Sequence, residues 1–98
     1  MAPEFEWDAK KANENLKKHG IAFEEALTVF ADPLARIFDD PDHSEDERRE
    51  LIIGYSVTQR LLVVSFTERE PRTRIIGARE ATAHERQDYE QNTSKWAT

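Results

Sequence analysis

The sequence contains no cysteine among its 98 residues, which excludes a disulfide framework and thiol chemistry. It has three glycines, and none belongs to a Gly-rich phosphate-binding loop. It also lacks an apolar run of about 18 residues, the length that a membrane-spanning helix needs. The first residues combine neither a basic flank nor an apolar core, so we expect no secretion signal and a cytoplasmic protein.

Charge is abundant and unevenly distributed. Charged residues make up 35% of the sequence and hydrophobic residues 38%, which indicates one domain with a thin core. Residues 1–47 contain 13 acidic and 5 basic residues, whereas residues 48–98 contain 7 acidic and 9 basic ones, eight of them arginine. Arginine matches phosphate with a planar, permanently charged fork. We therefore expect any nucleic-acid surface in the second half, with a solvated, salt-bridged surface as the alternative.

Periodicity and capping residues predict eight elements. Alternation at 5–7 predicts a strand, and Asp8 and Gly20 are suited to begin and end a helix. The other predicted elements are a helix over 23–31, strands over 34–38, 50–56, 61–67 and 73–79, and a last helix from Thr82 to about Gln91. Together they predict a single α+β domain over residues 1–91, in which two N-terminal helices pack on an antiparallel sheet. A frayed tail is expected at 92–98.

Arginines near two strand ends supply the first candidate site. Arg69 follows the strand over 61–67, and Arg74 and Arg79 lie on the next strand. Because their numbers differ by five, alternation places Arg74 and Arg79 on opposite faces of the sheet. An arginine on an uncovered sheet face can bind phosphate; the alternative is an ordinary solvent-exposed face.

The last helix and the end of the first supply further candidates. Glu85, Arg86 and Tyr89 form one patch at helical spacing, offering a carboxylate base, a charged clamp and a phenol donor. Alternatively, Tyr89 packs on the sheet while Glu85 and Arg86 pair. His19 is the best placed histidine for proton transfer, although the helix dipole alone favours a histidine at that position.

No metal and no cofactor are expected. The histidines lack ligand spacing, and the acidic stretch 39–47 lacks the turn glycine and ligand spacing of a calcium loop. Any chemistry must therefore come from the side chains themselves.

Several different short motifs follow one another along the chain. They are Phe5-Glu6-Trp7-Asp8, Lys11, Asn15, Lys18-His19-Gly20, Phe23-Glu24-Glu25-Ala26, Val29-Phe30 with Asp32-Pro33, Thr67-Glu68-Arg69, Arg74-Ile75-Ile76-Gly77-Ala78-Arg79, and Glu85-Arg86 with Tyr89. In this order and at these spacings, over about residues 4–91, the chain resembles the BrnT family of toxins from type II toxin–antitoxin modules. Gly77 departs from the serine that the family usually has there.

The resemblance implies a fold like that of the RelE and ParE toxins and an endoribonuclease that inhibits translation. It also implies a BrnA-type antitoxin with a ribbon-helix-helix element, RNA as the substrate, and contact with operator DNA only through the antitoxin. The alternative is a non-catalytic partner or co-repressor of a DNA-binding antitoxin.

For such a nuclease we expect cleavage without a metal, in which the RNA 2′-hydroxyl attacks the adjacent phosphate. Arg69 and Arg79 are then expected to stabilise the developing charge. Glu85 or His19 is the expected base, and Tyr89 the expected donor.

Overall fold

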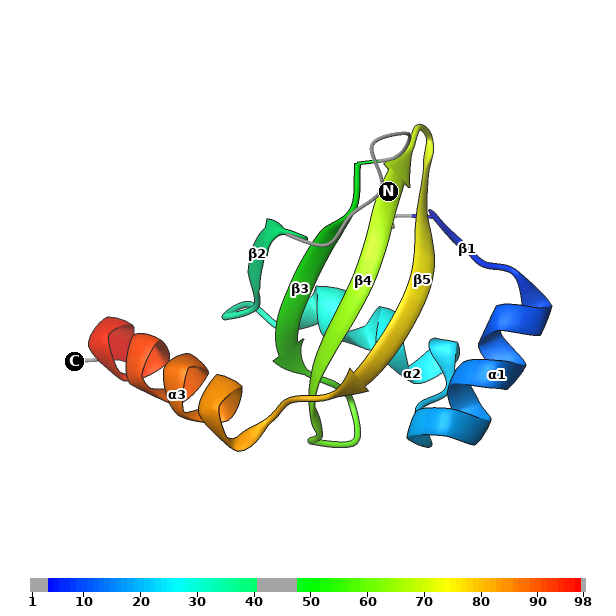
Figure 1. Cartoon of the computed structure of the whole chain (residues 1–98). Coiled ribbons are helices and arrows are strands. Elements are labelled where there is room, and N and C mark those ends of the chain that lie inside the picture. Colours follow the sequence, from blue (N-terminus) through cyan, green and yellow to red (C-terminus); the bar gives the residue numbers. More distant parts are fainter. Residues whose placement is uncertain (1–3, 41–47, 98) are drawn as a thin grey trace.

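Residues 4–40 and 48–97 are described by a computed structural model of the chain (Figure 1). Five strands form one sheet in the order β1-β5-β4-β3-β2. The elements are β1 (Glu4–Glu6), α1 (Ala9–His19), α2 (Phe23–Ala26), the 3₁₀ helix η1 (Leu27–Ala31), β2 (Arg36–Asp39), β3 (Glu50–Tyr55), β4 (Leu61–Arg69), β5 (Arg72–Glu80) and α3 (Ala83–Ala97). The α+β class is therefore confirmed.

The sheet is mixed, so the prediction of an antiparallel sheet is wrong at one edge. The pairs β2–β3, β3–β4 and β4–β5 are antiparallel, whereas β1 runs parallel to β5, with Glu4 beside Arg72 and Glu6 beside Arg74. Short connections predict antiparallel pairing only for consecutive strands. β1 and β5 are separated by most of the chain, so that rule did not apply to them.

A bulge interrupts β5. Ser65 lies opposite Gly77 and Phe66 opposite Ile75, which leaves Ile76 as an extra residue. An extra residue shifts the alternation of side chains beyond it.

The bulge overturns the prediction that Arg74 and Arg79 lie on opposite faces. Arg74 lies opposite Thr67 and Arg79 opposite Val63. Directly paired residues share a face, and Thr67 and Val63 are an even number of residues apart on β4. Both arginines therefore point to the same side of the sheet, which we call the arginine face.

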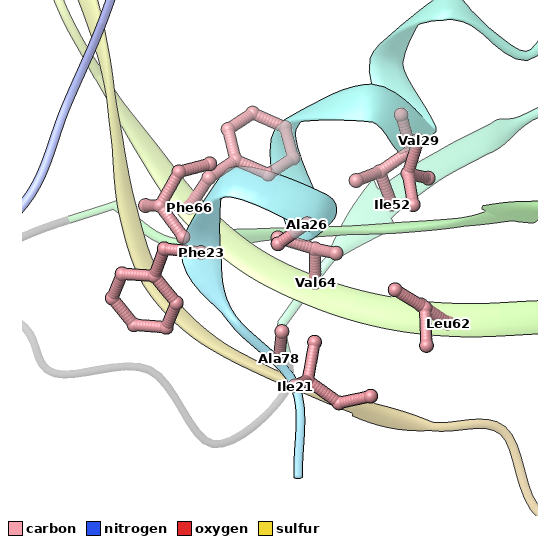
Figure 2. Close-up of a cluster of buried hydrophobic side chains, with 10 residues drawn as sticks. Ile21, Phe23, Ala26, Val29, Ile52, Leu62, Val64, Phe66 and Ala78 are labelled. Atoms are coloured by element: carbon pink, nitrogen blue, oxygen red, sulfur yellow. The ribbon is translucent and has the colours of Figure 1, made fainter. Parts of the chain in front are cut away.

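The opposite face is covered by α2 and η1, which pass behind the strands in Figure 1. Its buried cluster (Figure 2) consists of Ile21, Phe23, Ala26, Val29, Ile52, Leu62, Val64, Phe66, Ile75 and Ala78. The ring of Phe30 meets that of Phe66 edge-on, with centroids 5.0 Å apart. α1 has no buried residue; its partly buried Ala12 packs at the border of the cluster.

A smaller cluster lies on the arginine face, where Tyr89 of α3 packs with Ile53, Leu61 and Val63. α3 follows the predicted capping box, since Thr82 N–H donates to Glu85 and Glu85 N–H donates to Thr82 Oγ1. The helix continues to Ala97, so its predicted end near Gln91 is wrong. No glycine or proline follows Gln91 to stop it.

The carboxylate of Glu25 joins α2 to the β3–β4 connection. It accepts hydrogen bonds from Ser56 Oγ at 2.7 Å and from Arg60 Nε at 2.9 Å, and it forms an ion pair with Arg60. Its side chain is only 13% exposed. The hydrogen bond from Arg60 is the largest cause that holds the pKa of Glu25 at about 2, below its usual 4.5.

We predict that Glu25→Gln lowers the free energy of unfolding by about 1–3 kcal/mol at pH 7, because charge-assisted hydrogen bonds are lost. The folded pKa lies below the ordinary value, so this stabilisation is complete above about pH 4.5 and disappears as the pH falls towards 2. Thermal unfolding of both proteins across this range should show curves that converge in acid. The exposed Glu24→Gln is the control, and a difference independent of pH would contradict the prediction.

Candidate active site

A cleft of about 520 Å³ opens between the end of α1, the arginine face and the start of α3. It brings together three of the six predicted site residues, namely His19, Arg79 and Glu85. The remaining lining residues are Asn15, Phe38, Asp40, Leu51, Val63, Ser65, Gly77 and Ala78. We call this the α1–α3 cleft.

Arg79 and Glu85 form a two-pronged ion pair at one wall of the cleft. Arg79 Nη1 lies 2.7 Å from Glu85 Oε1, and Nη2 lies 2.9 Å from Oε2. This contact is the largest cause that lowers the pKa of Glu85 to about 2. A general base works best with a pKa near the working pH, so paired Glu85 is a weak base at neutral pH. Its carboxylate takes the position on Arg79 that a phosphate would occupy.

His19 is the last residue of α1 and its side chain is exposed. The helix begins at Asp8, whose carboxylate accepts from the backbone N–H of Lys10 and Lys11, and it ends at Gly20 with a left-handed φ of 71°. Both predicted caps are confirmed. They place the imidazole among the groups that line the cleft.

Arg69 and Arg86 lie outside the cleft. Arg69 is opposite Arg72, and seven positions separate Arg72 from Arg79 along β5, which is roughly 20 Å. The predicted pairing of Glu85 with Arg86 is wrong, because Glu85 binds Arg79 while Arg86 reaches the hydroxyl of Tyr55 at 3.4 Å. The sequence grouped Glu85 with Arg86 only because each has helical spacing to Tyr89.

The end of β5 near Arg69 is tied to β1 by ion pairs. Arg74 Nη1 lies 2.9 Å from Glu6, and Arg72 approaches both Glu4 and Glu6. Sequence reasoning missed these partners, because they depend on the parallel pairing of two distant strands. The arginine face therefore has much of its charge balanced before any ligand binds.

Tyr89 is 3% exposed, and its hydroxyl donates to Asp32 Oδ2 at 2.8 Å. The same carboxylate oxygen accepts from Tyr55 N–H at 2.7 Å. Burial first, and then Asp32, raise the pKa of Tyr89 above its usual range. These contacts agree with the packing role that the sequence allowed, because the phenol proton points to Asp32 rather than into the cleft.

Asn15 also lines the cleft. It is one of the residues in the ordered sequence motifs, but it was not among the predicted site residues. It lies four residues before His19, on the same face of α1.

A second groove, of about 830 Å³, lies elsewhere. Its walls are mainly apolar, with Leu27, Phe30 and Val57 among them, and its carboxylate, Asp32, is already bound by Tyr55 and Tyr89. Among residues 4–40 and 48–97, no group of His, Asp or Glu side chains is arranged to hold a metal ion. The described helices include none that is long and apolar enough to cross a membrane. Of the two grooves, the α1–α3 cleft is the one lined by a histidine and an arginine.

The family model described as "Ribonuclease toxin, BrnT, of type II toxin-antitoxin system" matches residues 7–85. The chain belongs to the BrnT family. The resemblance seen in the sequence is thereby confirmed, and membership of a type II system implies an antitoxin partner.

The fold is similar to that of the Brucella abortus ribonuclease toxin BrnT, known from a 1.1 Å crystal structure. The two chains share 23% identity, with a TM-score of 0.63 over 83% of this chain and 99% of that chain. No curated protein matches the chain in sequence.

We predict that Tyr89→Phe lowers the free energy of unfolding by about 1 kcal/mol, because the buried Asp32 contact is lost. RNA cleavage should stay within about twofold of the unchanged protein, since removing one hydrogen bond from the packing of α3 leaves the cleft groups in place. Tyr55→Phe serves as the control, because the Tyr55 hydroxyl accepts a long contact of 3.4 Å from Arg86. Loss of cleavage in a folded Tyr89→Phe protein would restore the phenol as a proton donor.

Proposed function

We propose that this BrnT-family chain is a metal-independent endoribonuclease that cuts RNA in the α1–α3 cleft and thereby inhibits translation. The observation that supports this best is the presence of His19 and Arg79 in one cleft. A proton acceptor and a phosphate-binding cation are the two groups that this chemistry requires.

The RNA supplies its own nucleophile. His19 accepts the proton of the 2′-hydroxyl, the 2′-oxygen bonds to the adjacent phosphorus, and the bond to the 5′-oxygen breaks. The products are a 2′,3′-cyclic phosphate and a 5′-hydroxyl, and the protonated imidazole or water returns a proton to the leaving oxygen. Arg79 stabilises the charge that develops on the phosphoryl oxygens. No metal-activated water is needed, because the attacking oxygen belongs to the substrate.

Glu85 has a different role in this proposal from the base expected at first. Its carboxylate holds Arg79 in the absence of RNA and is displaced when a phosphate binds. Arg69 and Arg86, which lie outside the cleft, contact the RNA backbone further along the strand. Tyr89 holds α3 in place through Asp32.

One observation favours the alternative of a non-catalytic partner or co-repressor of a DNA-binding antitoxin. Arg79 is already neutralised by Glu85. A neutralised arginine attracts an RNA phosphate less, which favours a protein partner on this surface. Expression of the chain alone separates the two functions, because a nuclease arrests growth and a co-repressor does not.

We predict that Arg79→Ala reduces cleavage at least tenfold, in line with the roughly 10²–10³-fold typical of losing a charge-stabilising donor. Glu85→Gln should retain or increase cleavage, because glutamine still accepts the capping bond from Thr82 N–H but no longer neutralises Arg79. Both are measured on single-stranded RNA with and without EDTA, alongside thermal unfolding. A folded Glu85→Gln protein that has lost cleavage would identify Glu85 as the base.

We further propose that a BrnA-type antitoxin with a ribbon-helix-helix element silences the toxin by covering the arginine face. The complex would contact operator DNA through the antitoxin alone. Covering the phosphate-binding cation is the simplest way to block RNA, and charged contacts there would be screened by salt over about 8 Å at physiological ionic strength.

We predict that Arg69→Glu combined with Arg79→Glu weakens antitoxin binding by about tenfold or more, because opposed charges on this face are replaced by like charges. The matched control is Glu14→Arg with Glu24→Arg, two exposed positions on the N-terminal helices, which should bind normally. Titration calorimetry with the antitoxin measures both. The reverse pattern would place the antitoxin on the helices.

A further inference from the structure

The open edge of β5 is closed by a side chain rather than by a strand. β1 pairs only with residues Arg72–Arg74 of β5. Beyond them, the amide of Asn15 binds the backbone of Ala78 in both directions: Ala78 N–H donates to Oδ1 at 3.0 Å, and Nδ2 donates to Ala78 O at 2.9 Å. This two-way exchange is the pattern by which paired residues in an antiparallel ladder bind each other.

The same amide also fixes the turn that follows α1. Its Nδ2 donates a second hydrogen bond to Ile21 O at 3.0 Å, across the left-handed Gly20. Three contacts thus use both amide hydrogens and the amide oxygen. Aspartate would keep only the acceptor and would present negative charge to two carbonyl oxygens.

These contacts lie between the two groups of the proposed chemistry. Ala78 directly precedes Arg79 in β5, and His19 follows Asn15 by four residues, one turn along the same face of α1. All three side chains, Asn15, His19 and Arg79, line the α1–α3 cleft. α1 has no buried residue, so apolar packing constrains its position against β5 weakly.

We propose that Asn15 is a positioning residue, which sets the distance between His19 and Arg79 by fastening α1 to the open edge of β5. This inference rests on the proposed function. It adds that His19 and Arg79 act on the substrate phosphate at a separation that the amide of Asn15 sets. A displacement of about 1 Å at a reacting group can cost about 10²-fold in rate, so loosening this contact should act on turnover.

The test compares Asn15→Ala and Asn15→Asp with Asn13→Asp, which makes the same chemical change at an exposed position of the same helix. Turnover is measured on a mixed-sequence pool of single-stranded oligoribonucleotides. Binding is measured with the all-2′-deoxy pool, which cannot be cut by this chemistry. We expect turnover to fall about tenfold to a hundredfold in both Asn15 variants, binding to stay within about twofold, and Asn13→Asp to behave like the unchanged protein.

A double-mutant cycle with His19→Ala shows whether Asn15 acts through the histidine. We expect no further loss when Asn15→Ala is added to His19→Ala. Full turnover in the Asn15 variants, an additive loss in the double variant, or equal losses of binding and turnover would each overturn the inference. So would failure of both Asn15 variants to fold while Asn13→Asp folds, because the amide would then support the whole domain.

His19→Ala alone separates this inference from the proposed function. If that variant cuts RNA as fast as the unchanged protein, the histidine leaves the proposed mechanism and Asn15 has nothing to position. If it is inactive while the Asn15 variants are fully active, only the positioning role fails.

Discussion

The bulge at Ile76 in β5 determines which face of the sheet Arg79 occupies. If side chains alternated regularly from Ile75 through Ile76 to Arg79, Arg79 would share the face of Ile75, within the apolar layer under α2. Burying an unpaired guanidinium there would be costly. With the bulge, Ile75 and Ala78 both face the buried cluster, and Arg79 faces the cleft. With the bulge at Ile76, β5 contributes Ile75 and Ala78 to the core and Arg79 to the cleft.

Two side-chain contacts then attach helices to the sheet on either side of that site. Asn15 fastens α1 to the free edge of β5, and Tyr89 fastens α3 through Asp32. The helix ends place His19 and Glu85 in the same cleft as Arg79. The ion pair with Glu85 neutralises Arg79, so in the proposed function RNA and antitoxin would both compete with a carboxylate of the protein itself.

Local signals predicted local structure well. Asp8, Gly20 and the Thr82–Glu85 box mark the helix ends as expected, because capping needs only neighbouring residues. The parallel β1, the bulge and the partners of Arg74 and Tyr89 were missed, because each depends on residues far apart in the sequence. The ordered motifs predicted the family, which the family model confirms. Of the six predicted site residues, the cleft contains three: His19, Arg79 and Glu85.

We propose that RNA binds on the arginine face, between α1 and α3. Titrating the ¹⁵N-labelled protein with a 2′-deoxy oligonucleotide pool and following its amide signals by NMR tests this most directly. If RNA binds there, the largest shifts should occur at Asn15–His19, Val63–Ser65 and Gly77–Arg79, with signals of α2 and η1 little changed. Shifts concentrated at Leu27–Phe30 and Val57–Gln59, around the apolar groove, would contradict it.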